Sequence, residues 1–318
     1  MFLFTGWISR GILNRRGIVD LVLEAFICLA VVGFIVLSLG KAFKYAKMPM
    51  HTRWELYPVP KEKGRGEYGG SYYEEHLWWQ KPRETSFMGE LVDMLKEMLF
   101  IKKLFDNQRP LWWLSYAMHL GIYLLIAWAL LLFLGGLTVN SGVEVAAGNG
   151  IWPSLLFYLT CLCGGAGGVL VAFGSLSLFF KRLGDASLRI YSNPQDYFNL
   201  LFIFVVAVTG LVLWSGDPVF DGARQMAAAL LRFEPLAMEG LVIWHVVLLG
   251  CLLIYIPVSK MSHYVGKYFS FHKVLWDNEP NLPDSAIMKA VEEGQKQKPS
   301  TTWSAPHIKP PSSQASGQ

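Results

Sequence analysis

Three histidines of the 318-residue sequence lie within or just beyond long apolar runs: His119, His245 and His263. Ionisable side chains are rare in membrane-spanning segments and mark functional sites there. His245 and His263 are eighteen positions apart, which in one continuous α-helix is five whole turns and about 27 Å. Such a helix presents both imidazoles on the same face, one toward each membrane surface. This pattern suits haem groups stacked across a bilayer, each with a second axial histidine from another helix.

His119 is the histidine that lies within another apolar run, so it is the expected ligand from a second helix. Bis-histidine ligation suits electron transfer, because it leaves no open position on the iron for oxygen. The sequence contains no Cys-x-x-Cys-His motif and so does not indicate covalent c-type haem. We therefore expect b-type haem bound by His119 with His263 or His245, and a second haem if the remaining histidine has another ligand. The alternative is that all three histidines are hydrogen-bonded packing residues.

Depth in the membrane does not decide which histidine pairs with His119, because His119 lies about 15 Å along its apolar run from Arg109, between the depths of the other two. Several neighbours of His119 are candidates to flank a macrocycle: Trp112, Trp113, Tyr116 and Gly121. Haem propionates need cationic or donor partners near the membrane surface. The candidates at the ends of the apolar runs are Arg109, Arg182 and Lys260.

Two acidic residues in the first apolar run, Asp20 and Glu24, are one helical turn apart. They are candidates to accept protons from a quinol. A hydrated helix end explains them as well, since both lie close to the start of the run.

Long apolar segments must position these residues. The chain is 53% hydrophobic and only 16% charged, whereas soluble domains carry about 25% charged residues. A helix needs about 20 apolar residues to cross a bilayer, and five segments meet that requirement: Ile18–Leu39, Leu111–Leu134, Ile151–Phe180, Phe198–Ser215 and Leu241–Val258. The sequence therefore predicts an all-α integral membrane bundle of about five transmembrane helices.

The distribution of Lys and Arg predicts the orientation of this bundle. Thirteen lie between Lys41 and Arg109, three between Lys181 and Asp196, and seven from Lys260 onward. The other side has three before the first segment, none in the second loop and two in the fourth. The positive-inside rule places the N-terminus outside and the C-terminus in the cytoplasm, as expected for a multi-pass protein of the inner membrane. The net charge of +4 reflects these loops and does not indicate nucleic-acid binding.

The chain divides into four parts. Residues 1–40 hold the N-terminus and first span, 41–110 a cytoplasmic loop, 111–265 the haem-binding spans, and 266–318 a cytoplasmic tail that we expect to be largely disordered, because it is polar and Pro-rich. Within the loop, residues 86–105 have the periodicity of an amphipathic helix on the inner interface. The rest of the loop is rich in Arg, Trp and Tyr, a composition typical of contact with a partner protein and also of a loop folded back at headgroup level.

Several smaller patterns are structural. Asn193-Pro194-Gln195-Asp196 predicts a helix that starts at Pro194 with Asn193 as its N-cap. The glycines that follow Cys163 allow either close helix packing or the approach of a flat ligand. The four cysteines lie in apolar segments and are interpreted as small packing residues: Cys28, Cys161, Cys163 and Cys251.

The layout resembles the gamma subunit of respiratory nitrate reductase and, more closely, the cytochrome b subunits of the Dsr and Tmc transmembrane redox complexes of sulfate reducers. The similarity covers about residues 10–275 and rests on His245 and His263, on Met118-His119-Leu120-Gly121, and on Arg53-Trp54-Glu55-Leu56-Tyr57-Pro58. The resemblance implies haem b between the second and fifth spans, and a pairing of His119 with His263. It also implies electron exchange between a menaquinone-type quinone and a heterodisulfide-reductase-like iron–sulfur protein that binds the 41–110 loop, with a periplasmic cytochrome c as a further candidate partner.

The sequence departs from the nitrate reductase pattern at Ala129, where that family carries a second histidine on the second span. His245 therefore lacks an identified partner. The expected function is electron transfer within a multisubunit, quinone-reactive respiratory oxidoreductase rather than stand-alone catalysis. The alternative is a haem-free membrane anchor or transporter subunit, although the sequence has no internal repeat of the kind found in transporters.

Overall fold

The computed structural model describes residues 2–47, 76, 87–234, 236, 238–270, 283–284 and 286–297. These residues form helices and no β-strand: α1 (Phe2–Lys47), α2 (Phe87–Phe100), α3 (Lys102–Asn107), α4 (Arg109–Asn140), α5 (Ile151–Gly184), α6 (Ala186–Ile190), α7 (Pro194–Gly216), α8 (Asp221–Leu231), α9 (Leu241–Val258), the 3₁₀ turn η3 (Lys260–Ser262), α10 (His263–Ser270) and α11 (Ala286–Lys296). In this part of the chain, five helices are long and apolar enough to span a membrane: α1, α4, α5, α7 and α9. The prediction of an all-α membrane bundle with five spans is confirmed.

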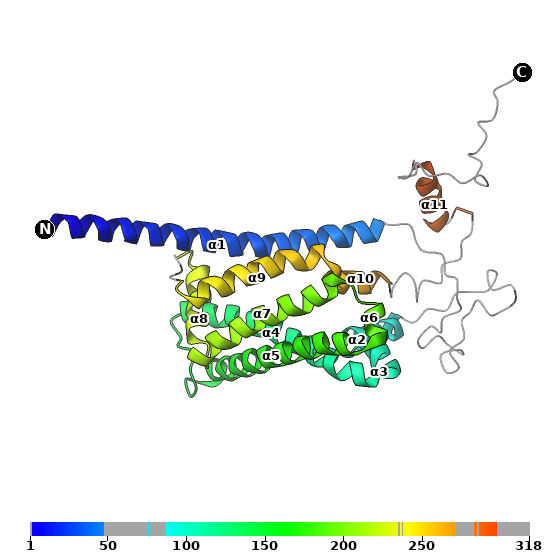
Figure 1. The fold of residues 1–318 in the computed structure, drawn as a ribbon, viewed down its shortest axis with the longest axis horizontal. Coiled ribbons are helices and arrows are strands. Elements are labelled where there is room, and N and C mark those ends of the chain that lie inside the picture. Colours follow the sequence, from blue (N-terminus) through cyan, green and yellow to red (C-terminus); the bar gives the residue numbers. More distant parts are fainter. Residues whose placement is uncertain are drawn as a thin grey trace, which may run out of the picture.

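The five spans lie side by side, with α4 against α5, α5 against α7, and α7 against α9. α1 runs along the outer side of α9 (Figure 1). The short helices α2, α3, α6 and α10 lie at one end of the bundle, and α8 packs against α4 at the other. The end with α10 also carries the C-terminus of α1, so Lys44 and Lys47 in the last turn of α1 lie at the same end as α10.

The start of α7 follows the sequence prediction. Asn193 is the N-cap, and its side-chain oxygen accepts a hydrogen bond from the Asp196 backbone N–H at 3.2 Å. The Asp196 carboxylate accepts one from the Asn193 N–H in return, at 2.9 Å. This capping box satisfies two backbone donors that the first helical turn leaves unpaired.

Glycines allow α4 and α5 to pack with their backbones in near contact. A Cβ added at Gly174 of α5 would lie 2.5 Å from the Met118 backbone nitrogen of α4. A Cβ at Gly121 of α4 would lie 2.7 Å from the Val171 nitrogen of α5. Of the two interpretations of the glycine run, close helix packing is the one that these contacts support. The expectation that Gly121 flanks a macrocycle is wrong, because Gly121 faces α5.

The predicted amphipathic helix over residues 86–105 is two helices, α2 and α3. They are separated at Ile101, whose backbone has φ 51° and ψ 51°. On α2 the exposed side chains are mostly apolar: Phe87, Met88, Leu95, Leu99 and Phe100. Such a face suits a helix that lies at a membrane surface. The aromatic part of the preceding loop, including residues 53–58, lies outside the described residues.

The last span is not one continuous helix. α9 contains Pro257 in its final turn and ends at Val258, Ser259 is extended, and α10 starts only at His263. Proline lacks a backbone N–H and weakens the turn that contains it. The Ser259 hydroxyl then accepts a hydrogen bond from the Met261 N–H at 3.2 Å and so starts a new turn. The prediction that five unbroken helical turns join His245 to His263 is therefore wrong.

The described part of the tail contains α11, a helix that its polar sequence does not predict. Most of the remaining tail lies outside the described residues.

Gly174→Ala should destabilise the bundle. The new methyl group would meet the α4 backbone, which cannot rotate away as a side chain can, and such overpacking costs about 1–3 kcal/mol. Thermal unfolding of the detergent-solubilised protein measures the effect. Gly184→Ala is the matched control, because a Cβ at Gly184 in the same helix has no atom within 4 Å. Equal unfolding temperatures for the two variants would contradict the proposed close contact between α4 and α5.

Candidate functional site

His119 lies on the face of α4 that also carries Tyr116 and Tyr123. Its Nδ1 lies 2.7 Å from the Ser115 carbonyl oxygen. Because a carbonyl oxygen only accepts hydrogen bonds, Nδ1 must carry the proton and donate it. The lone pair of the half-buried imidazole is then on Nε2, the atom that would bind a metal ion.

His263 is the first residue of α10, and its imidazole lies beside that of His119. The two ring centroids are 6.1 Å apart, with the ring planes at 64°. The Nδ1 of His263 is 3.4 Å from the Lys260 carbonyl oxygen. As in His119, the backbone contact of His263 involves Nδ1 and not Nε2. The structure thus brings together two histidines that are far apart in the sequence.

The separation of the two ring centroids is close to that of two imidazoles that bind one metal ion from opposite sides. With metal–nitrogen bonds of about 2.0–2.1 Å and a ring nitrogen about 1.1 Å from its ring centre, two imidazoles on opposite sides of an ion have centroids roughly 6.2–6.4 Å apart. Among the described residues no group of three or more His, Cys, Asp or Glu side chains could hold a metal ion. A six-coordinate haem iron needs two axial ligands, which two histidines can supply, and His119 and His263 are candidates for this pair.

His245 lies elsewhere, near the start of α9 and against α7. Its Nδ1 is 2.9 Å from the Thr209 hydroxyl oxygen. Gly210 leaves room for its ring, since a Cβ there would lie 3.1 Å from Cε1. Among the described residues, the two histidines whose rings lie in contact are His119 and His263, and His245 is not part of that contact. The structure therefore does not identify a second ligand opposite His245.

α2 lies against the face of α4 that carries His119. The Tyr123 hydroxyl donates to the Met98 carbonyl at 2.5 Å, and the Trp112 indole N–H donates to the Phe100 carbonyl at 2.7 Å. Trp112 also stacks on Tyr116, with centroids 4.7 Å apart. The aromatic residues next to His119 therefore attach α2 to the bundle, and α2 covers one side of the candidate site.

Glu97 of α2 is a buried carboxylate. It is only 5% exposed, and it accepts hydrogen bonds from Lys267 Nζ at 2.7 Å and from the Lys103 N–H at 2.8 Å. Lys267 lies one helical turn after His263 on α10. Periodicity could not identify this pair, because its members are 170 positions apart.

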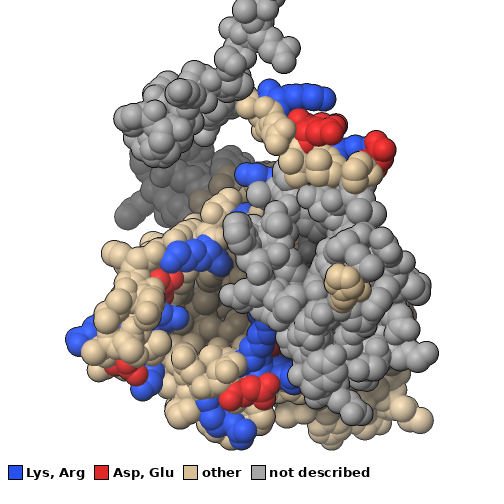
Figure 2. Space-filling view, turned by 90° about the vertical axis from the view of Figure 1, so that its right-hand side faces the viewer, with Lys and Arg blue, Asp and Glu red and all other residues tan. Residues whose placement is uncertain are grey.

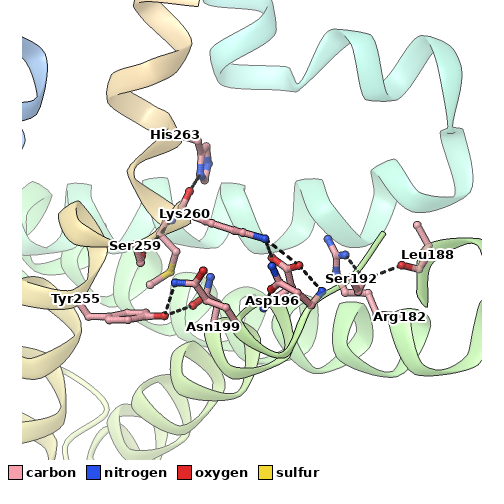
Figure 3. A network of polar contacts seen from close by, with 12 residues as sticks. Arg182, Leu188, Ser192, Asp196, Asn199, Tyr255, Ser259, Lys260 and His263 are labelled. Carbon is pink, nitrogen blue, oxygen red and sulfur yellow. Dashed lines mark hydrogen bonds and ion pairs between the residues drawn. The ribbon is translucent and has the colours of Figure 1, made fainter. Parts of the chain in front are cut away.

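A polar network surrounds the start of η3 and α10 (Figure 3). Lys260 Nζ contacts the Asp196 carboxylate at 3.2 Å, and Gln195 donates to the Tyr255 hydroxyl at 3.2 Å. That hydroxyl donates in turn to the buried Asn199 side chain at 2.8 Å. The network ties α9 to α7 immediately before the break that precedes His263.

The three cations considered for haem propionates already have protein partners. Lys260 pairs with Asp196, Arg182 donates to the Ser192 hydroxyl at 2.8 Å, and Arg109 lies 3.7 Å above the Phe105 ring. Figure 2 shows this end of the molecule, where several Lys and Arg side chains, together with Asp and Glu, lie near a hollow with a mostly uncharged wall.

The remaining candidates lie on other parts of the spans. Asp20 and Glu24 are partly exposed on α1, and Leu23 between them packs against Leu236 and Met238. The four cysteines are free thiols.

Lys267→Met should destabilise the attachment of α2, because it leaves the buried Glu97 carboxylate without its cation. Removing one member of a buried pair costs about 3–5 kcal/mol. Since the Lys267 side chain is 33% exposed, we expect a smaller loss, about 1–3 kcal/mol. The double variant Glu97→Gln/Lys267→Met should recover part of it. Asp106→Asn is the control, because the Lys102–Asp106 pair is about half exposed on both sides. If thermal unfolding is equal for Lys267→Met and Asp106→Asn, the buried pair has no stabilising role.

No family model and no solved structure matches the chain. One protein of Archaeoglobus profundus is similar, described as "Hdr-like menaquinol oxidoreductase cytochrome b-like subunit". It is 29% identical over 135 residues, which is 36% of this chain and 40% of the relative. The chain thus matches less than half the length of this relative. The chain is thus distantly similar to a cytochrome b-like subunit over part of its length.

Proposed function

We propose that the chain is a membrane cytochrome b subunit that carries electrons between a menaquinone-type quinone and a cytoplasmic iron–sulfur protein. The observation that carries this proposal is the pair His119 and His263, 6.1 Å apart between ring centroids in a bundle of membrane-spanning helices. The name of the Archaeoglobus relative, which includes both menaquinol and cytochrome b, supports the same function.

His119 and His263 would hold one haem b through their Nε2 atoms. When bound, haem supplies an iron that takes up and releases one electron at a time. The protein fixes the imidazoles: the Ser115 carbonyl holds the Nδ1 proton of His119, which sets the tautomer and makes the ring a better ligand. The aromatic contacts of Trp112 and Tyr116 with α2 and α3 keep water from this side of the site.

His245 serves a different step in this proposal. Its imidazole is held by Thr209 on α7, and the structure provides no histidine across from it among the described residues. We therefore propose one haem per chain, with a second only if another subunit supplies the ligand opposite His245. Without that ligand, His245 lies at the outer end of the spans. The Thr209 hydroxyl donates to the Val206 carbonyl at 2.9 Å, so it accepts from the Nδ1–H of His245. Nε2 then has a lone pair that can accept a hydrogen bond from a quinol hydroxyl.

The orientation and partners follow from charge. The end that carries α2, α6 and α10 faces the cytoplasm under the positive-inside rule. The hollow near several Lys and Arg side chains (Figure 2) and the preceding aromatic loop would then receive a heterodisulfide-reductase-like iron–sulfur partner. The opposite end would face a periplasmic donor or acceptor such as a cytochrome c.

Haem content tests the proposal directly. Membranes or purified complex should show a dithionite-induced b-type α band, with about one haem per chain. His119→Ala and His263→Ala should each abolish it, because each removes one of the two ligands that would hold the haem iron. The double variant should lose no more than either single variant, since the two residues act on one group. His245→Ala should keep the haem and slow quinol-dependent haem reduction.

Other outcomes identify other functions. Loss of haem in His245→Ala, with normal haem in His263→Ala, would assign the ligand pair to His119 and His245. If the absorption spectrum of the parent protein shows no haem band, a haem-free anchor or transporter subunit is favoured instead.

The orientation has its own test. A reporter fused after Gln318 should be active when it requires the cytoplasm and silent when it requires the periplasm. The reverse result would place the loop before α2 on the outer surface and remove the proposed docking of a cytoplasmic partner.

A further inference from the structure

α1 contacts the residues on both sides of His263. The Ser38 hydroxyl lies 2.5 Å from the Tyr264 hydroxyl, and Phe34 stacks on the Tyr264 ring with centroids 6.0 Å apart. On the other side, Lys41 Nζ donates to the Ser262 hydroxyl at 2.6 Å. The residue before His263 and the residue after it are thus both attached to α1, although α1 supplies no histidine.

Lys41 also occupies the helix break itself. Its Nζ donates to the Pro257 carbonyl oxygen at 2.9 Å, at the point where α9 ends. Ser262 is only 6% exposed, and its hydroxyl donates to the Ser259 carbonyl at 2.8 Å while it accepts from Lys41. One ammonium group therefore joins the last turn of α9 to the residue that precedes α10.

These contacts matter because the helical geometry of α9 does not determine where His263 points. An extended residue and a 3₁₀ turn separate α9 from α10, and the eight-residue α10 is too short to be stable alone. A rotation at the break would move the His263 ring relative to His119 on α4. An axial ligand must keep both its distance and its direction, so the break requires a clamp.

We propose that Lys41 and Ser38 are positioning residues for His263: they clamp the helix break from α1 and hold the imidazole at the distance from His119 that iron ligation needs. This inference rests on the proposed function, because it assigns His263 an axial position. It gives the first span a role in the chemistry that its sequence alone does not indicate.

The test is the coordination state of the haem in the full-length protein in its native membranes. In the parent protein both axial positions are filled, so ferrous haem should bind almost no carbon monoxide. Lys41→Met removes both hydrogen bonds but keeps the length of the side chain. It should raise the fraction of haem that binds carbon monoxide several-fold and add a high-spin ferric signal, while the haem content stays close to that of the parent. Lys41→Arg retains the charge and the donors and should restore most of the low-spin haem.

Lys44→Met is the matched control, since Lys44 is an exposed lysine in the last turn of the same helix. Ser38→Ala and Tyr264→Phe each remove one hydroxyl from the second contact without a change in charge, and they test the clamp if Lys41→Met accumulates poorly. Each should give a smaller rise in carbon monoxide binding than Lys41→Met.

The results separate the two proposals. A parent protein that contains no haem overturns the proposed function before any variant is compared. If Lys41→Met has a normal haem content and binds no more carbon monoxide than the parent, the clamp alone is overturned. If Lys41→Met does not accumulate, the same result in both Ser38→Ala and Tyr264→Phe overturns it. An equal rise in Lys44→Met also overturns it, because the effect would then come from the charge at this end of the helix.

Discussion

Backbone groups at a helix break in a membrane protein have few water molecules to bind, so they must find hydrogen-bond partners within the protein. In this chain the break follows Pro257, and the carbonyl of Pro257 itself accepts from Lys41 of the first span. Ser259 and Ser262 satisfy neighbouring groups through their hydroxyls. The break can exist because these side chains reach it, and the break is what frees His263 to turn toward α4. The pair of histidines therefore depends on contacts made by a helix that carries neither of them.

Two kinds of packing hold the rest of the molecule. In the middle of the bundle, glycines bring α4 and α5 into backbone contact, where many small van der Waals contacts replace the hydrophobic effect that lipid does not provide. At the end with α10, the Phe100–Tyr116 stack joins α2 to α4, the Glu97–Lys267 pair joins α2 to α10, and the Asp196–Lys260 pair joins α7 to η3. The rigid middle positions His119 on α4, and the polar end positions His263. The candidate site lies where these two regions meet.

Much of the fold could be predicted from the sequence, because the hydropathy of five long segments and the Asn193 cap are local signals. The three candidate histidines were also evident, since each is an ionisable group in or beside an apolar run. Pro257 is a local signal for the break, because a proline inside a helix weakens the turn that contains it, but the five-turn spacing of His245 and His263 favours a continuous helix instead. The distance between His119 and His263 depends on that break and on tertiary contacts. The contacts of Glu97 and Lys41 could not be predicted from the sequence, because their partners lie far along the chain. Locally, Glu97 is a polar residue of an amphipathic helix, and Lys41 is a basic residue that follows a span.

The position of α1 also has a consequence for how the protein is made. α1 leaves the ribosome before the other four spans, yet it packs mainly on α9 and α10, which follow all of the others in the chain. It must therefore remain in the bilayer as a single helix until the other four spans have been inserted, whereas α4 and α5, joined by a short loop, can associate at once. The contacts of α1 with the residues on both sides of His263 can therefore form only after α9 and α10 have been made. The nascent bundle is therefore open on the side of α1 until α9 and α10 have been made.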